Sequence, residues 1–102
     1  DISSKNLTTI KRGAYSECSG ITKFNVVSTK LNSMGKYALY RTGKLKTVIF
    51  KTGYLTKSNV GSKAFSGIKS TATFTVPAGS VQNYKDLFKS KGAGSKFKVK
   101  SL

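Results

Sequence analysis

The sequence predicts a short β-solenoid, in which one strand of each repeat stacks on the equivalent strand of the next repeat. Three observations predict this class of fold. Apolar features recur in one common register, short alternating segments lie between turns rich in Gly, Ser and Thr, and the pattern changes after residue 77. At 102 residues the chain has the length of one domain, so we expect a single domain over residues 1–102.

The repeat is most visible in pairs of a small and a large apolar residue. These pairs are Ala14-Tyr15, Ala38-Leu39 and Ala64-Phe65, and their alanines are 24 and 26 positions apart. Two further features keep the same offsets: Ile10, Met34 and Val60 stand four positions earlier, and alternating segments begin ten positions later at Phe24, Val48 and Phe74. Because three features share one register, we predict three repeats, over residues 7–30, 31–57 and 58–77.

Each repeat contains one strand in which apolar and polar residues alternate. Successive side chains of a strand point to opposite faces, so one face of the stacked strands forms the core and the other faces outward. The outward side chains line up across the repeats and form our candidate ligand-binding face: Lys23, Asn25, Thr47, Ile49, Thr73 and Thr75. The alternative is a merely solvated face. Ile49 argues against that alternative, since an outward apolar side chain gains nothing from contact with water.

Residues 78–102 depart from the repeat and predict a C-terminal cap. We expect a helix of about three turns, with Ser80 capping its first turn and Gly92 ending it in a left-handed conformation. Its apolar face consists of Val81, Tyr84, Leu87 and Phe88. The alternating residues 97–100 predict a last strand. Such a helix and strand would cover the end of the third repeat.

The N-terminal end shows no comparable cap. The first repeat is therefore expected to expose an unpaired strand edge and apolar surface. Two consequences are expected as alternatives, namely partial disorder over residues 1–6 or self-association with a second copy at this end.

Several residues outside the strands have expected roles. Gly35, Gly61 and Gly67 are interpreted as turn glycines at repeat corners. The repeat register points the single cysteine, Cys18, inward and predicts a small core residue rather than a reactive thiol. Three tyrosines fall outside the inward register and are the aromatic residues to inspect for surface exposure: Tyr37, Tyr40 and Tyr54.

The composition argues against an enzyme. The chain has no His, and its acidic side chains are limited to Asp1, Glu17 and Asp86. General acid-base catalysis and metal binding both depend mostly on these residue types. We therefore expect no catalytic residue, no metal and no cofactor. The apolar runs are far shorter than the ~20 residues that cross a bilayer, so no transmembrane segment is expected.

The charge balance is strongly basic. There are 19 Lys and Arg residues against 3 Asp and Glu, which gives a net charge of +16 that attracts any polyanion. Only Arg12 and Arg41 are arginines. Arginine is the usual side chain for bidentate recognition of phosphates and bases, whereas lysine acts as a solvated point charge. We therefore favour a solubilising surface and keep a specific anionic ligand as the alternative.

The repeats resemble those of the BspA-like leucine-rich repeat family of bacterial cell-surface and secreted proteins. The element that carries the resemblance has an apolar residue, three variable positions, Ala and an aromatic residue or Leu, and it is clearest over residues 60–68 and the following 74–77. Residues 81–92 and 96–99 are similar to the lysine-rich closing segment of such proteins from gut Firmicutes. The first two repeats depart from the pattern, since Tyr15 and Leu39 replace the usual Phe and no Pro follows Val26 or Phe50.

This resemblance implies a leucine-rich-repeat-like β-solenoid with a helix-plus-strand cap at its C-terminus. It also implies an extracellular, non-catalytic binding or adhesion module at the C-terminal end of a larger surface or secreted protein. The expected partner is a host or matrix protein or glycan, or an anionic surface polymer. Two other hypotheses remain open: a basic protein that binds nucleic acid or another polyanion, for which nucleic acid is the less favoured ligand, and a structural spacer attached to a catalytic domain.

Overall fold

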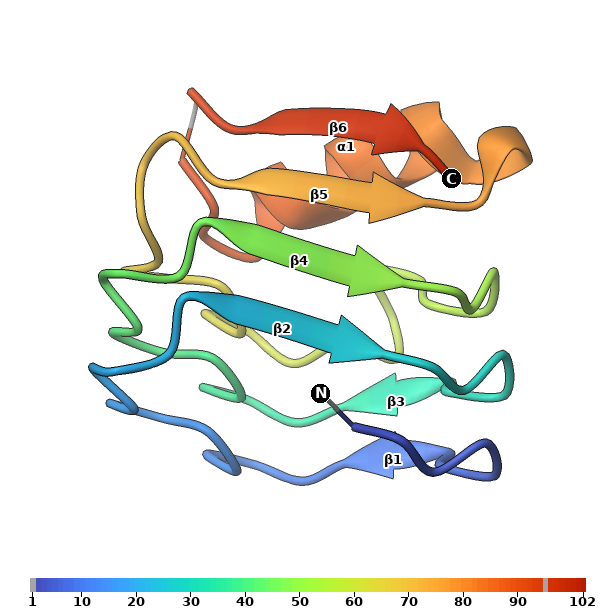
Figure 1. The fold of residues 1–102 in the computed structure, drawn as a ribbon, viewed down its shortest axis with the longest axis horizontal. Helices are drawn as coiled ribbons and strands as arrows, with labels where there is room; N and C mark the ends of the chain where they lie inside the picture. The colour runs from blue at the N-terminus through green and yellow to red at the C-terminus, as the bar shows by residue number, and fades with distance from the viewer. Residues whose placement is uncertain (1, 95) are drawn as a thin grey trace.

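The computed structural model describes residues 2–94 and 96–102, and these form the predicted solenoid (Figure 1). Its strands are β1 (Thr9–Ile10), β2 (Lys23–Val26), β3 (Ser33–Met34), β4 (Thr47–Phe50), β5 (Thr73–Val76) and β6 (Lys98–Ser101). A 3₁₀ turn, η1 (Ala78–Ser80), leads into the helix α1 (Val81–Ser90). The fold class predicted from the repeat is confirmed, with short parallel strands and a C-terminal helix and strand.

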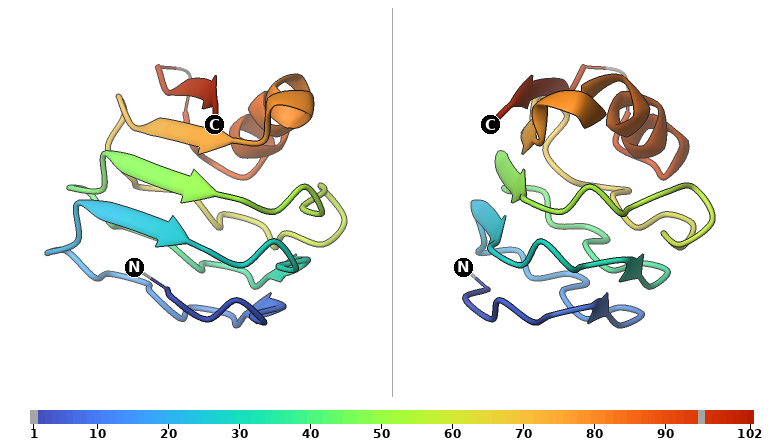
Figure 2. Two further views of the ribbon diagram at one scale, coloured as in Figure 1. Left: turned by 45° about the vertical axis from the view of Figure 1, so that its right-hand side comes forward. Right: turned by 90° about the vertical axis from the view of Figure 1, so that its right-hand side faces the viewer.

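Two parallel ladders hold the coils of the solenoid together. The main sheet has the order β2-β4-β5-β6, and every neighbouring pair in it is parallel. A second ladder pairs β1 with β3 and continues through a bridge between Met34 and Val60. We call the segment from β1 to β2 the first coil, that from β3 to β4 the second, and that from Val60 to β5 the third. Figure 2 shows these coils stacked beneath α1 and β6.

The register of both ladders is the one that the sequence repeat predicts. Phe24 pairs with Val48, and Val48 pairs with Phe74. Between the ladders, the turns also bond from coil to coil. The backbone N–H of Tyr15 donates to the carbonyl of Ala38 at 2.9 Å, and that of Leu39 donates to the carbonyl of Ala64 at 2.8 Å. The offsets of 24 and 26 residues are therefore the lengths of the first two turns of the coil.

A continuous apolar core runs through the centre of the coils. Its aliphatic part includes Leu31, Leu39 and Leu45, all 0% exposed, while its aromatic part passes from Tyr15 at one end to Phe97 at the other. Phe88 of α1 is the centre of the aromatic part, because its ring contacts those of Phe50, Phe65, Phe74, Tyr84 and Phe97. The ring of Phe88 stacks on that of Phe74 with centroids 3.9 Å apart. The cap is thus an integral part of the core.

Gly35 and Gly61 allow the backbones of successive coils to approach each other closely. A Cβ atom at Gly35 would lie 2.2 Å from the backbone nitrogen of Arg12, and one at Gly61 would lie 2.2 Å from that of Lys36. Neither glycine has a positive φ. Gly35 begins a turn as expected, since the N–H of Ala38 donates to its carbonyl at 3.2 Å. Both glycines are needed there for the space between coils rather than for a left-handed conformation. Gly67 has a left-handed conformation, with φ of 81°, which suits the expected turn glycine.

Buried hydroxyl groups connect each corner of the main sheet to the coil before it. Ser28 Oγ donates to the carbonyl of Leu7 at 2.7 Å, and Thr52 Oγ1 donates to the carbonyl of Leu31 at 2.6 Å. The cap completes this series, since the hydroxyl of Tyr84 donates to the carbonyl of Thr52 at 2.6 Å. The same hydroxyl accepts a bond from the Leu55 N–H. Burial raises the pKa of Tyr84 because it disfavours the phenolate, and the bond from Leu55 partly offsets this.

The two ends of α1 differ in how well they match our predictions. Ser80 makes no side-chain capping bond, because η1 runs directly into α1 and the expected N-cap is replaced by a 3₁₀ turn. At the other end Gly92 has φ of 103°. The N–H of Ala93 donates to the carbonyl of Phe88, and that of Gly92 to the carbonyl of Lys89, which is the bonding pattern of a Schellman motif. The predicted glycine stop is confirmed.

The N-terminal end forms backbone hydrogen bonds to β2 that we did not expect. The N–H of Ile2 donates to the carbonyl of Asn25, and the N–H of Val27 donates to the carbonyl of Ile2, so the chain pairs with β2 at this point. The expectation of a wholly unpaired edge is wrong there, while Asp1 lies outside the described residues. Tyr15 remains only partly buried, whereas Leu39 and Phe65 in the same column are 0% exposed.

Cys18, like Tyr15, lies in the first coil and is less buried than its equivalents in the later coils. Its equivalents 24 and 50 positions further on are Thr42 and Ile68, both buried, which places Cys18 in an inward column. Cys18 itself is only partly buried. The predicted inward direction of the side chain is consistent with this column. Its burial is only partial because, within the described residues, no earlier coil covers the first one.

We expect Phe65→Ala to lower the free energy of unfolding by about 3–5 kcal/mol, because it leaves a cavity beneath Phe88 that the stacked coils cannot close. A denaturant titration measures this loss directly. A loss below about 1 kcal/mol would contradict the packing described above, since that is less than the cost of removing a fully buried ring.

Gly61→Ala should destabilise the protein by about 3 kcal/mol, the upper part of the range for overpacking, because its Cβ would meet the backbone of Lys36. The matched control is Gly20→Ala, where an added Cβ would have no atom within 4 Å. Thermal unfolding of the two variants provides the comparison. Equal stability of both variants would show that the coils can separate at Gly61 without cost.

Candidate binding face of the sheet

The structure brings the six predicted face residues together on the outer side of the main sheet. They form two rows across β2, β4 and β5. Lys23, Thr47 and Thr73 are aligned in the first row, and Asn25, Ile49 and Thr75 in the second. The alternate residues of the same strands, such as Val48 and Phe74, are 0% exposed. The predicted inward and outward assignment is therefore correct for these strands.

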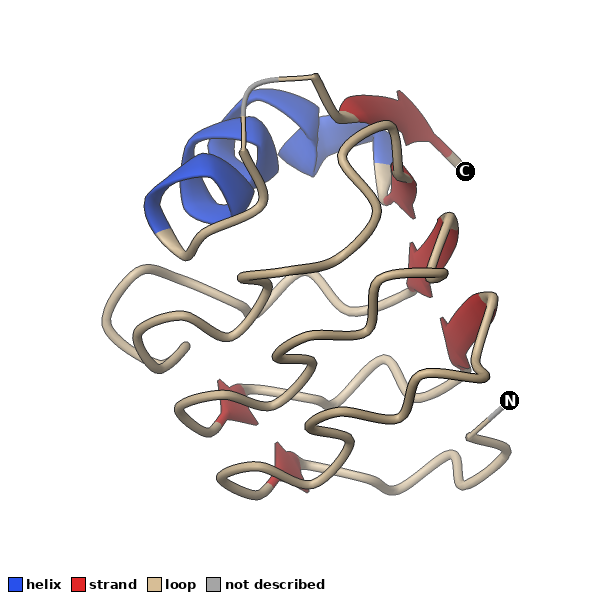
Figure 3. Cartoon of the chain, turned by 90° about the vertical axis from the view of Figure 1, so that its left-hand side faces the viewer, coloured by secondary structure: helices blue, strands red, loops and turns tan. Residues whose placement is uncertain are grey.

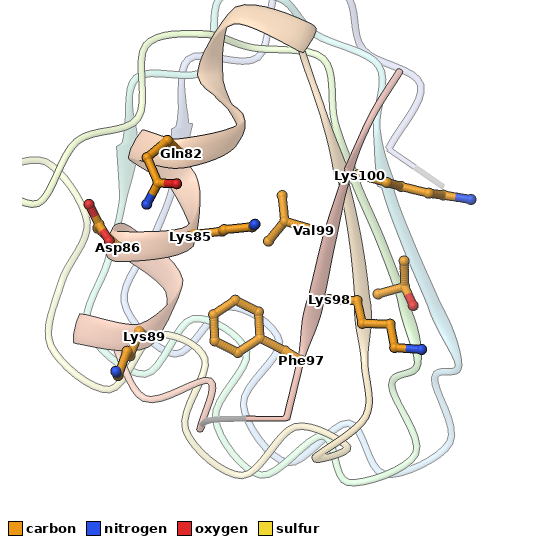
Figure 4. Close-up of a pocket in the computed structure, with 9 residues that line it drawn as sticks. Gln82, Lys85, Asp86, Lys89, Phe97, Lys98, Val99 and Lys100 are labelled. Atoms are coloured by element: carbon orange, nitrogen blue, oxygen red, sulfur yellow. The ribbon is translucent and has the colours of Figure 1, made fainter.

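Strand β6 extends both rows by one lysine each, which the sequence prediction missed. Lys98 pairs with Thr73, and Lys100 pairs with Thr75. In Figure 4 their side chains point away from α1, whereas Phe97 and Val99 point toward it. The alternation in residues 97–100 did predict a strand. Its position beside β5 could not be derived, because α1 interrupts the repeat and removes the offset that aligned the other strands.

The face combines positive charge at its edges with small polar side chains and one apolar side chain between them. Lys23, Lys98 and Lys100 are exposed at its two edges, and the five residues between them on β2, β4 and β5 are partly buried. Those five residues supply three hydroxyl groups, one amide and the apolar side chain of Ile49. Within residues 2–94 and 96–102, no group of three or more His, Cys, Asp or Glu side chains could hold a metal ion. The face offers hydrogen bonds, apolar contact and positive charge.

A second candidate surface lies at the C-terminal end of the solenoid. A groove of about 790 Å³ runs between α1 and β6, and Figure 4 shows Lys85 and Val99 pointing into it from its two sides. Phe97 and Val99 supply apolar surface, while Lys85 and Lys89 supply positive charge. The groove and the sheet face share Lys98 and Lys100, so β6 forms the boundary between them.

The three tyrosines outside the inward register differ in exposure. Tyr54 is 63% exposed, whereas Tyr37 and Tyr40 are partly buried. The rings of Tyr37 and Tyr40 contact each other with centroids 4.9 Å apart. Both belong to the turn that joins β3 to β4, and neither contributes to the sheet face.

Stacked coils, two parallel ladders and a terminal cap define a solenoid repeat protein with an open outer sheet face. The family model described as BspA type leucine-rich repeat region (6 copies) matches residues 1–101. The chain belongs to this family of leucine-rich repeat proteins. No curated protein and no solved structure matches the chain.

Membership of the family has general consequences. Leucine-rich repeat modules are generally non-catalytic and typically present a protein-binding or adhesive surface, and BspA-type repeats are often found in surface proteins. Among the helices of the described residues, none has the length and apolar character needed to cross a membrane.

Proposed function

We propose that the chain is a non-catalytic extracellular binding or adhesion module that contacts its partner through the outer face of the main sheet. The proposed face consists of the six predicted residues together with Lys98 and Lys100. The proposed partner is a host or matrix protein or glycan. The module would form the C-terminal part of a larger cell-surface or secreted repeat protein, which the cap formed by α1 and β6 supports.

The observation that carries this proposal is the position of Ile49. Its row partners are Asn25 and Thr75, so an apolar side chain stands at the centre of a polar, open face. The stacked strands hold these side chains in fixed positions, so the side chains need not become more ordered when a partner binds. A flat surface with an apolar centre and a polar rim has the organisation of a recognition surface.

An anionic surface polymer is the alternative partner, and the net charge of +16 favours it. Under this alternative the lysines act through their field and no particular face is needed. Binding would then be independent of the sequence or structure of the polymer. It would also weaken steeply with salt, as counterions are released.

Self-association at the N-terminal end remains a prediction. The position equivalent to Gly35 and Gly61 is Lys11 in the first coil. Because only glycine allows the close approach seen between the later coils, the side chain of Lys11 would oppose a second copy stacked in the same register. The apolar surface of the partly buried Ile2, Leu7 and Tyr15 favours association, and Lys11 limits how close it can be.

The double variant Ile49→Lys and Thr75→Lys tests the sheet face against the general field. If the face recognises a shape-matched partner, binding to immobilised mucin and to isolated bacterial cell walls should fall at least about ten-fold at physiological salt, the equivalent of about 1.4 kcal/mol. Binding to heparin should instead become tighter, because the positive charge rises.

The matched control is the double variant Thr8→Lys and Asn32→Lys, which adds the same charge at two exposed positions outside the sheet face and the groove. It should strengthen heparin binding to a similar degree and leave binding to mucin and cell walls intact. Unchanged or tighter binding of the Ile49 and Thr75 variant to both preparations would refute the sheet face and leave the electrostatic alternative.

A further inference from the structure

A second surface with distinct chemistry lies on the turns that join β1 to β2 and β3 to β4. These turns run side by side across the view in Figure 3, and the N–H of Gly13 and that of Glu17 bond to carbonyls of the second turn. Five side chains from them form a cluster that we call the Arg-Tyr patch: Arg12, Lys36, Tyr37, Tyr40 and Arg41. None of the five belongs to the sheet face.

The patch gathers both arginines of a chain whose other basic residues are all lysines. The guanidinium carbon of Arg12 lies 5.8 Å from the ring centroid of Tyr37, and that of Arg41 lies 5.5 Å from the ring centroid of Tyr40. The repeat brings the two arginines onto neighbouring coils. A guanidinium held over an aromatic ring keeps its in-plane N–H groups available for an acceptor and loses less freedom when it binds one.

A carboxylate already occupies part of this patch. Glu17 Oε1 lies 3.8 Å from Arg41 Nη1, and both side chains are about two-thirds exposed, at 67% and 65%. Ion pairs with this exposure contribute little to stability, so the pair can be opened at low cost. Glu17 is also one of only 3 acidic residues in the chain. It therefore stands in for an external carboxylate at Arg41.

We propose that the Arg-Tyr patch binds carboxylates of an acidic segment in a partner protein, which displace Glu17 from Arg41. Planar carboxylates match the paired N–H groups of a guanidinium, and Glu17 shows that a carboxylate reaches Arg41. Stacked nucleic-acid bases fit the patch less well, because cations already lie over the rings of Tyr37 and Tyr40. The patch is separate from the sheet face, so this proposal does not depend on the proposed function.

Removal of the internal competitor provides the first test. The probe is a fluorescent synthetic peptide of alternating Glu and Ser, whose affinity is measured by anisotropy at physiological salt. Glu17→Gln should tighten binding about three- to five-fold, because Arg41 no longer has an internal partner. Asp86→Asn is the matched control, since it makes the same charge change on the exposed side of α1 and should alter the affinity less than about two-fold.

Charge-preserving variants provide the second test. Arg12→Lys combined with Arg41→Lys keeps the net charge but removes both guanidinium groups, and should weaken binding of the peptide about ten-fold. In the Arg41→Lys background the gain from Glu17→Gln should largely disappear, because the two residues act through one contact.

Three outcomes would overturn the proposal. Equal gains from Glu17→Gln and Asp86→Asn would show that only the overall field matters. Unchanged peptide binding in the Arg12 and Arg41 double variant would show that guanidinium groups are not required. Loss of binding to a heparin oligosaccharide or an oligonucleotide in that double variant, without loss of peptide binding, would assign the patch to a different class of ligand.

Discussion

The close distance between successive coils is the constraint on which the rest of this structure depends. Strands of two to four residues contribute too few hydrogen bonds to persist alone, so each coil is stabilised by its neighbours. Gly35 and Gly61 permit the required approach, and the hydroxyls of Ser28 and Thr52 bond to carbonyls of the coil before them. If the coils separated, the hydrogen bonds of both ladders would break and the apolar core would become exposed at the same time.

The cap ends this stacking by replacing what a further coil would supply. Phe88 fills the aromatic centre of the core, and Tyr84 takes the hydroxyl role that Ser28 and Thr52 have in the coils. Strand β6 pairs with β5 and presents alternate lysines at the edge of the sheet. Charged residues on an edge strand oppose unwanted pairing with another chain. The same lysines enlarge the proposed binding face, so one strand has both roles.

The repeat also explains why the two proposed surfaces differ in chemistry. Residues in equivalent positions of successive coils become neighbours in space. Each surface is therefore composed of rows that cross the coils rather than of residues adjacent in the sequence. The rows on the strands hold three threonines and, at the edges of the sheet, three lysines, with Ile49 among the inner positions. The rows on the turns hold the two arginines and their tyrosines.

The sequence by itself determined the class of fold, the register of the three coils and the inward or outward direction of each strand residue. It did so because a solenoid converts a sequence offset directly into contact between neighbours, as the pairs of Phe24 with Val48 and of Ile10 with Met34 show. Only the tertiary structure decided the features that depend on distances between coils or on the cap. The spatial need for Gly35, the place of Lys98 beside Thr73, and the contact of Glu17 with Arg41 are three of them. Each depends on how closely, and in what orientation, two distant backbone segments pack, and no offset along the chain contains that information.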